Sequence, residues 1–101
     1  MHRLLRLKCL YELSDTSTFY YNFAVSNAQN FQKFLKPNRI LSEEKKELYA
    51  VFIKFTLKLL RLKNKSARKR DNQKKKILSE LEAPNFKSAS KDWLVKKIKL
   101  L

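Results

Sequence analysis

The residue types that most often carry catalysis or metal binding are scarce in this chain. Among 101 residues there is one cysteine, Cys9, and one histidine, His2. One thiol and one imidazole cannot form a disulfide, and they cannot supply the ligand set of a zinc site within one chain. We therefore expect no enzymatic activity, no metal and no cofactor. Because Cys9 lies among leucines, we expect it to be a small buried side chain.

Two further features of the sequence argue against a phosphate-binding loop and against a metal site. The chain contains no glycine, whereas phosphate-binding loops need glycine so that the backbone can approach the phosphates. Glu43, Glu44 and Glu47 form an acidic cluster. Their place at the start of a predicted helix explains them without a metal, because carboxylates stabilise a helix N-terminus.

Positive charge is the strongest signal in the sequence. There are 24 Lys and Arg against 9 Asp and Glu, a net charge of +15. Residues 61–76 hold nine of the basic residues and one acidic residue, Asp71, so that more than half of the net charge falls in this run. Lys54 and Lys58 extend the basic surface along the preceding predicted helix. The predicted nucleic-acid-binding residues are Lys54, Lys58, Arg61, Lys63, Lys65, Arg68, Lys69, Arg70, Lys74, Lys75 and Lys76.

Such a run favours binding to phosphates. Each Lys or Arg that neutralises a phosphate releases a counterion, which gives affinity without any contact to a base. No zinc-finger, homeodomain, KH or RNA-recognition signature accompanies the run. The sequence therefore predicts non-specific binding to DNA or RNA. An acidic protein surface and anionic lipid headgroups remain open as partners, because the same charges would attract them.

The second functional hypothesis is a helical protein–protein interaction module, which includes the C-terminal domain or a subunit of a larger assembly. The high apolar content of so charged a chain favours it, because 44% of the residues are hydrophobic. A docking module of this kind would present an apolar face to its partner.

Apolar residues recur at spacings of three and four, with no sustained alternation at two, which predicts an all-α fold. We expect one small basic domain over residues 1–101, with four or five helices. The basic run at 61–76 is predicted either as a helix projecting into solvent or as a mobile linker. The expected helices lie near 3–13, 17–35, 42–64, 73–82 and 91–100.

Capping residues and apolar spacing give finer expectations. Ser42 and Ser90 are predicted N-caps, and residues 14–17 offer several more before the second helix. Tyr11, Tyr21 and Trp93 are the aromatic residues that we consider for the surface. The predicted core comprises Phe19, Phe23, Phe31, Leu48, Phe52, Phe55, Leu59, Leu81, Leu94 and Ile98.

No stretch of the sequence is long and apolar enough to span a membrane. The longest apolar run covers the six residues 48–53, far below the ~20 that a membrane-spanning helix needs. We therefore expect no integral membrane segment. The expected location is the cytoplasm, where a lone thiol stays reduced.

Part of the chain resembles a known kind of sequence. Residues 19–65, with an aromatic-rich first helix, an LSEEKK start and an FIKF…LLRL helix, together with the closing KDWLVKKIKLL, carry the likeness. They resemble the C-terminal helical region of uncharacterised bacterial proteins. The resemblance implies a helical fold, names no activity, and raises the expectation that the chain is the tail of a longer protein.

Overall fold

The computed structural model describes residues 2–101, and these residues form five α-helices and no strand. The prediction of an all-α fold is confirmed. The basic run is helical over most of its length, because the fourth helix begins at Ala67, six residues before the expected start. The helices are α1 (His2–Leu13), α2 (Thr18–Leu35), α3 (Glu43–Lys63), α4 (Ala67–Leu81) and α5 (Lys91–Leu100).

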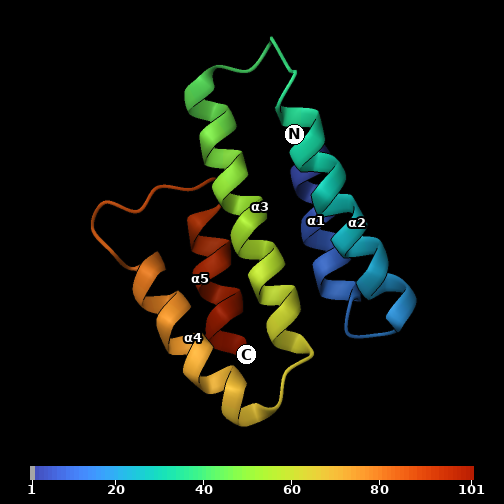
Figure 1. Ribbon diagram of the computed structural model, residues 1–101, viewed down its shortest axis with the longest axis vertical. Coiled ribbons are helices and arrows are strands. Elements are labelled where there is room, and N and C mark those ends of the chain that lie inside the picture. The colour runs from blue at the N-terminus through green and yellow to red at the C-terminus, as the bar shows by residue number, and fades with distance from the viewer. Residues whose placement is uncertain (1) are drawn as a thin grey trace.

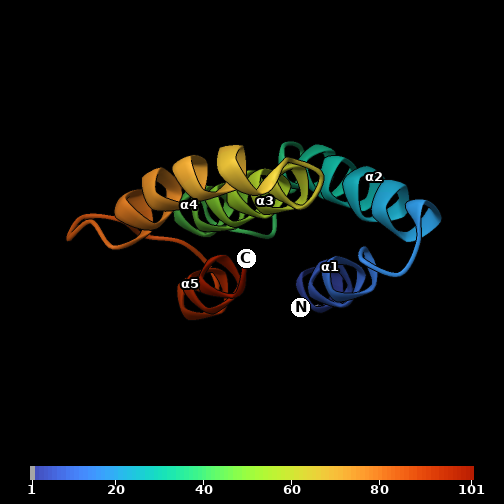
Figure 2. The same ribbon diagram turned by 90° about the horizontal axis from the view of Figure 1, so that it is seen from below.

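The helices form two layers. Helices α2, α3 and α4 lie side by side in one layer, and α1 and α5 form the second layer (Figures 1 and 2). The molecule is flat, with extents of 42 × 36 × 16 Å. Helix α3 is central, and it packs against α2, α4 and α5. It is accordingly the most buried helix, with eight buried residues.

Serine side chains begin two of the helices as expected. The hydroxyl of Ser17 accepts a hydrogen bond from the Tyr20 amide, and that of Ser42 accepts one from the Lys45 amide, each at 3.2 Å. Both bonds satisfy an amide that has no partner within its helix. Ser90 precedes α5 but makes no such bond, so the prediction that its side chain caps α5 is wrong. Its backbone lies instead in the left-handed region, with φ of 52°.

The predicted core is correct in α4 and α5 and, apart from Leu48, in α3, but it is wrong in part of α2. Phe19 is 66% exposed and Phe23 is 48% exposed. The buried row of α2 contains Ala24 and Phe31, and Phe23 lies one position, or about 100°, away from that row. Spacing of four shows that two residues share a face, but not that the face is buried. Leu48 is half-buried rather than fully buried.

Helix α1 buries Leu7, Leu10 and Tyr11 but leaves Cys9 exposed. Tyr11 is 3% exposed, and its ring meets that of Trp93 edge-on at 5.2 Å between centroids. Trp93 is half-buried and also packs against Phe52, at 5.6 Å. Cys9 is exposed, so the prediction that it is buried is wrong. The reason is that Leu7, rather than Cys9, shares the inner face of α1 with Tyr11.

None of the described helices combines the length and the apolarity needed to cross a membrane.

Candidate nucleic-acid interface

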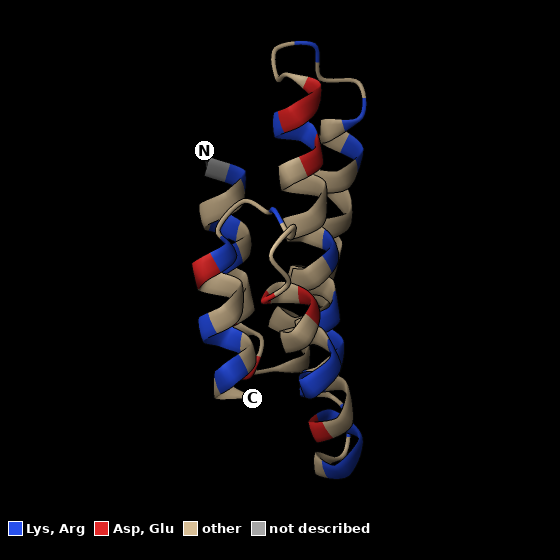
Figure 3. Cartoon of the chain, turned by 90° about the vertical axis from the view of Figure 1, so that its left-hand side faces the viewer, with Lys and Arg blue, Asp and Glu red and all other residues tan. Residues whose placement is uncertain are grey.

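The predicted basic residues lie on the second half of α3, on the turn at 64–66 and on α4. Lys and Arg recur along α4, whereas acidic residues gather at the start of α3 (Figure 3). The eleven residues belong to adjacent helices, but the structure directs their side chains to different tasks.

Arg70 points back at the end of α3. Its Nε donates a hydrogen bond to the Leu62 carbonyl at 3.2 Å. Its Nη2 donates to the carbonyls of Lys63 at 2.9 Å and of Lys65 at 3.4 Å. The last carbonyls of a helix have no intrahelical partner, and a cation there also offsets the negative end of the helix dipole. Arg70 therefore holds the α3–α4 turn together.

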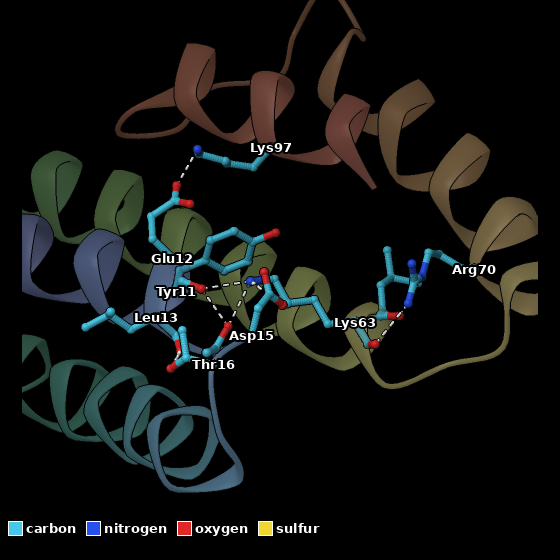
Figure 4. A network of polar contacts seen from close by, with 10 residues as sticks. Tyr11, Glu12, Leu13, Asp15, Thr16, Lys63, Arg70 and Lys97 are labelled. Atoms are coloured by element: carbon cyan, nitrogen blue, oxygen red, sulfur yellow. Dashed lines mark hydrogen bonds and ion pairs between the residues drawn. The ribbon is translucent and has the colours of Figure 1, made fainter.

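Lys63 points in the other direction, towards the end of α1 (Figure 4). Its Nζ donates to the Tyr11 carbonyl at 2.7 Å and to the Ser14 hydroxyl at 2.8 Å. The same Nζ lies 3.3 Å from a carboxylate oxygen of Asp15 and 3.7 Å from the centroid of the Tyr11 ring. The Lys63 side chain is only 8% exposed. It links α3 to α1 and has no free face for a phosphate.

Burial changes the pKa values of two residues in this network. Burial lowers the pKa of Lys63, and the neighbouring Asp15 carboxylate opposes that change. Burial also raises the pKa of Tyr11, and the negative charges of Asp15 and Glu12 add to the effect. Across the same cluster, Lys97 of α5 forms an ion pair with Glu12 of α1. These side chains thus connect three helices.

Two further predicted residues make contacts at the α3–α4 seam. The Lys58 ammonium lies 3.5 Å from the Glu80 carboxylate and 4.5 Å from the centroid of the Phe55 ring. Lys65 donates to the side-chain carbonyl of Gln73 at 2.7 Å. Such solvent-accessible contacts contribute only about 0–1 kcal/mol each, so a phosphate could replace them.

Lys74 contacts the end of another helix. Its Nζ donates to the Lys99 carbonyl at 3.2 Å. This carbonyl belongs to the last turn of α5, where a cation is favourable. The contact is exposed, so Lys74 keeps the freedom to turn towards a ligand.

The other six predicted residues are exposed, and none of their side chains forms a hydrogen bond or ion pair with another residue in the range 2–101. Lys69 and Lys76 are seven positions apart and share one face of α4, which borders α3. Arg68 and Lys75 form a second row on the outer side of α4. We call these six the outward cations: Lys54, Arg61, Arg68, Lys69, Lys75 and Lys76.

A shallow hollow of about 240 Å³ lies between α3 and α4. Four cationic side chains and one carboxylate surround it, over the buried side chain of Ile77. Such a hollow can accept a phosphate group, but it offers no arrangement that would distinguish one base from another. Its lining residues are Lys58, Arg61, Lys65, Gln73, Lys76, Ile77 and Glu80.

The sequence alone did not show that Lys63 and Arg70 point inward. A basic residue close to a helix C-terminus is a known capping signal, and Arg70 lies within reach of the end of α3. For Lys63 no local signal exists, because its partners are Tyr11, Ser14 and Asp15, about fifty positions away.

No group of three or more potential metal ligands occurs in the part of the chain that the structure describes. Comparison with protein-family models, with curated proteins and with solved structures found no match for this chain. The resemblance to uncharacterised bacterial proteins therefore stays a prediction. We accordingly infer the function from the geometry and charge of the chain itself.

Proposed function

We propose that this protein binds DNA or RNA non-specifically through the outward cations of α3 and α4. One observation carries the proposal: six basic side chains of two adjacent helices are exposed and unpaired within residues 2–101. Lys58, Lys65 and Lys74 support them, because their weak surface contacts can exchange for phosphates. Lys63 and Arg70 contribute to the fold rather than to the contact.

The affinity should depend steeply on salt. If about five phosphates are neutralised on duplex DNA, the logarithm of the binding constant falls with the logarithm of salt concentration at a slope of about −4 to −5. The affinity should vary little with base sequence, because phosphate contacts carry no sequence information.

A fluorescence-anisotropy titration over a range of salt concentrations tests the proposal, with random duplex and single-stranded oligonucleotides as probes. The informative variant replaces Arg68, Lys69, Lys75 and Lys76 by Gln. Its slope on duplex DNA should be shallower by up to ~4, since each lost phosphate contact changes the slope by about one.

A matched control removes four exposed charges from other parts of the chain, by replacing Lys33, Lys36, Lys87 and Lys96 with Gln. This control has the same net charge as the α4 variant, and its slope should stay close to that of the wild type. Equal losses in both variants would show that net charge alone attracts the oligonucleotide. That result, or undetectable binding at low salt, would reject the proposed surface.

An acidic protein surface would meet the same outward cations. Polyglutamate as a competitor separates the two partners, because it matches the charge but lacks the regular phosphate spacing. We expect oligonucleotides to displace polyglutamate at lower concentration than the reverse. The opposite order would favour an acidic protein as the partner.

The proposal includes no chemical step, so we propose no enzymatic activity. The location that we propose is the cytoplasm, where both nucleic acid and reducing conditions are present. The free, exposed thiol of Cys9 supports this location. One continuous cluster of buried side chains, with contributions from all five helices, supports a single domain.

A helical interaction module, as a domain or subunit of a larger assembly, is the second candidate. Exposed apolar side chains on both sides of the α1–α2 turn favour it, among them Leu13 and Phe19. If no oligonucleotide binds at low salt, this candidate becomes the leading one.

A further inference from the structure

Exposed apolar side chains gather at one end of the α1–α2 hairpin. Phe19 is 66% exposed, Phe23 48%, Leu13 41% and Tyr20 37%. The centroid of the Phe19 ring lies 5.4 Å from that of Tyr20 and 6.0 Å from that of Phe23, so the three rings are continuous. These four residues, which we call the aromatic face, are the majority of the seven exposed large hydrophobic residues in the described chain.

The stretch of chain that carries the three rings of the aromatic face is electrically neutral. Residues 16–32 contain no charged side chain, although charged residues make up 33% of the protein. Helix α2 has one basic residue, Lys33, whereas each of the other four helices has at least three. No cation along residues 16–32 could hold a phosphate beside these rings, so the aromatic face is poorly suited to nucleic acid. An acidic partner would likewise be drawn to α4 instead.

We propose that a second copy of this chain docks on the aromatic face, with α2 packed against α2 about a two-fold axis. Two copies of a protein with net charge +15 repel each other. A two-fold interface uses the same patch on both copies, so the patch must tolerate its own charge. Helix α2 meets this condition, because two copies can approach there with few apposed Lys or Arg side chains.

The charges at the two ends of the neutral stretch favour an antiparallel pair. Asp15 precedes the stretch and Lys33 follows it. The Asp15 side chain is 69% exposed even though it pairs with Lys63, and Lys33 is exposed too. In an antiparallel pair each Asp15 lies towards the Lys33 of the other copy, which is an attractive arrangement.

The size of the interface sets the expected strength. Helix α2 has 18 residues, so it is about 27 Å long and, with side chains, about 10–12 Å wide. Its free face would bury roughly 300 Å² on each copy, well below the ~800 Å² of a stable interface. We therefore expect a weak dimer, with a dissociation constant on the order of 100 μM.

Sedimentation equilibrium of the whole chain tests the proposal directly. Between ~10 μM and ~1 mM the average mass should rise from that of the 12.1 kDa monomer towards twice that value. Replacing Phe19 and Phe23 by Lys should weaken the dimer at least tenfold, because it adds four cations to the interface. Neither ring belongs to the buried core, since Phe19 is 66% and Phe23 48% exposed, so the variant should fold, and circular dichroism checks this.

The matched control replaces Ile40 and Leu100 by Lys. These side chains are 94% and 71% exposed and lie outside the aromatic face. The control adds the same charge and should dimerise nearly as well as the wild type. A wild type that stays monomeric at ~1 mM, or a control that loses the dimer equally, would overturn the proposal.

Cross-linking locates the interface without disturbing it. In a Cys9→Ser background, Ser26→Cys places one thiol near the middle of α2, and Ser79→Cys places one on α4; both serines are exposed. A short bis-maleimide reagent should link two copies of the Ser26→Cys chain and not two copies of the Ser79→Cys chain. The reverse result would show that the interface does not lie on α2.

Salt separates this proposal from nucleic-acid binding. Added salt screens the repulsion between copies, so the dimer should become stronger. Binding to an oligonucleotide should instead weaken, because counterion release is less favourable in high salt. The two proposals can therefore fail independently.

Discussion

Two pairs of basic residues from the same run have different surroundings. Lys63 and Arg70 point inward and satisfy groups at the ends of α1 and α3. Arg68 and Lys69 lie immediately beside Arg70 in the sequence, yet their side chains are exposed and unpaired within residues 2–101. A dense run of charge is therefore not a uniform binding surface.

Helix geometry explains the difference on α4. Arg70 is seven positions before the buried Ile77, so the two side chains share one face of the helix. Arg68 precedes Arg70 by two positions, which places it about 200° round the helix axis and towards solvent. We therefore expect substitution of Arg68 and Lys69 to change oligonucleotide binding, and substitution of Lys63 and Arg70 to change the free energy of unfolding.

The largest expected effect is that of Lys63→Met on folding. The variant keeps an apolar stem but removes the donor to the Tyr11 carbonyl and the Ser14 hydroxyl, and the partner of Asp15. We expect the free energy of unfolding to fall by about 2–3 kcal/mol, the range for charge-assisted hydrogen bonds that are lost from a mostly buried site. Urea denaturation measures this. The salt slope of oligonucleotide binding should not change. A variant that is as stable as the wild type but has a shallower slope would show that Lys63 contacts phosphate instead of stabilising the fold.

The sequence was sufficient for the five helices because each one needs only a local pattern. Spacing of three and four located α2, α3 and α5 closely, and Ser17 and Ser42 begin their helices as expected. The start of α4 was missed because Ala67 to Gln73 has almost nothing to bury. This segment is helical by continuity with Ile77 and Leu81 and through the contact of Arg70 with α3.

What the sequence could not supply depends on neighbours that are distant in the chain. Phe19 and Phe31 are equally apolar, but none of the described helices covers the side of α2 on which Phe19 lies. Likewise, the role of Lys63 depends on where the end of α1 reaches α3. A pattern within one helix defines its faces, whereas the packing of the other helices decides which face is buried.

A smaller effect should distinguish Arg70 from Arg68. Arg70→Gln removes the hydrogen bonds to the carbonyls of Leu62 and Lys63, so we expect a loss of about 1–2 kcal/mol in the free energy of unfolding. Arg68→Gln removes an exposed side chain and should change that energy by less than ~0.5 kcal/mol. Urea denaturation of both variants makes the comparison. Equal losses would contradict the inward role of Arg70.

The smallest effect at neutral pH is that of Tyr11→Phe, which becomes visible only in alkali. Burial raises the pKa of Tyr11 above its ordinary value of 10.0. Above about pH 10 the unfolded chain loses the phenolic proton while the folded chain keeps it. Folding stability therefore falls, by up to ~1.4 kcal/mol per pH unit. The lowered pKa of Lys63 has the opposite effect on stability. Between that lowered pKa and pH 10.5 the unfolded chain binds a proton that the folded chain has released, so folding stability rises with pH.

Comparing the wild type with Tyr11→Phe isolates the tyrosine, because the lysines titrate in both proteins. Urea denaturation should show equal stabilities within ~0.5 kcal/mol at neutral pH, and a growing advantage of the variant above about pH 10. Tyr20→Phe is the matched control, because Tyr20 is 37% exposed and lies on the aromatic face, outside the buried network around Lys63. If the two variants follow the same curve, Tyr11 does not keep its proton on folding, and the buried network that holds Lys63 inward must be open to solvent.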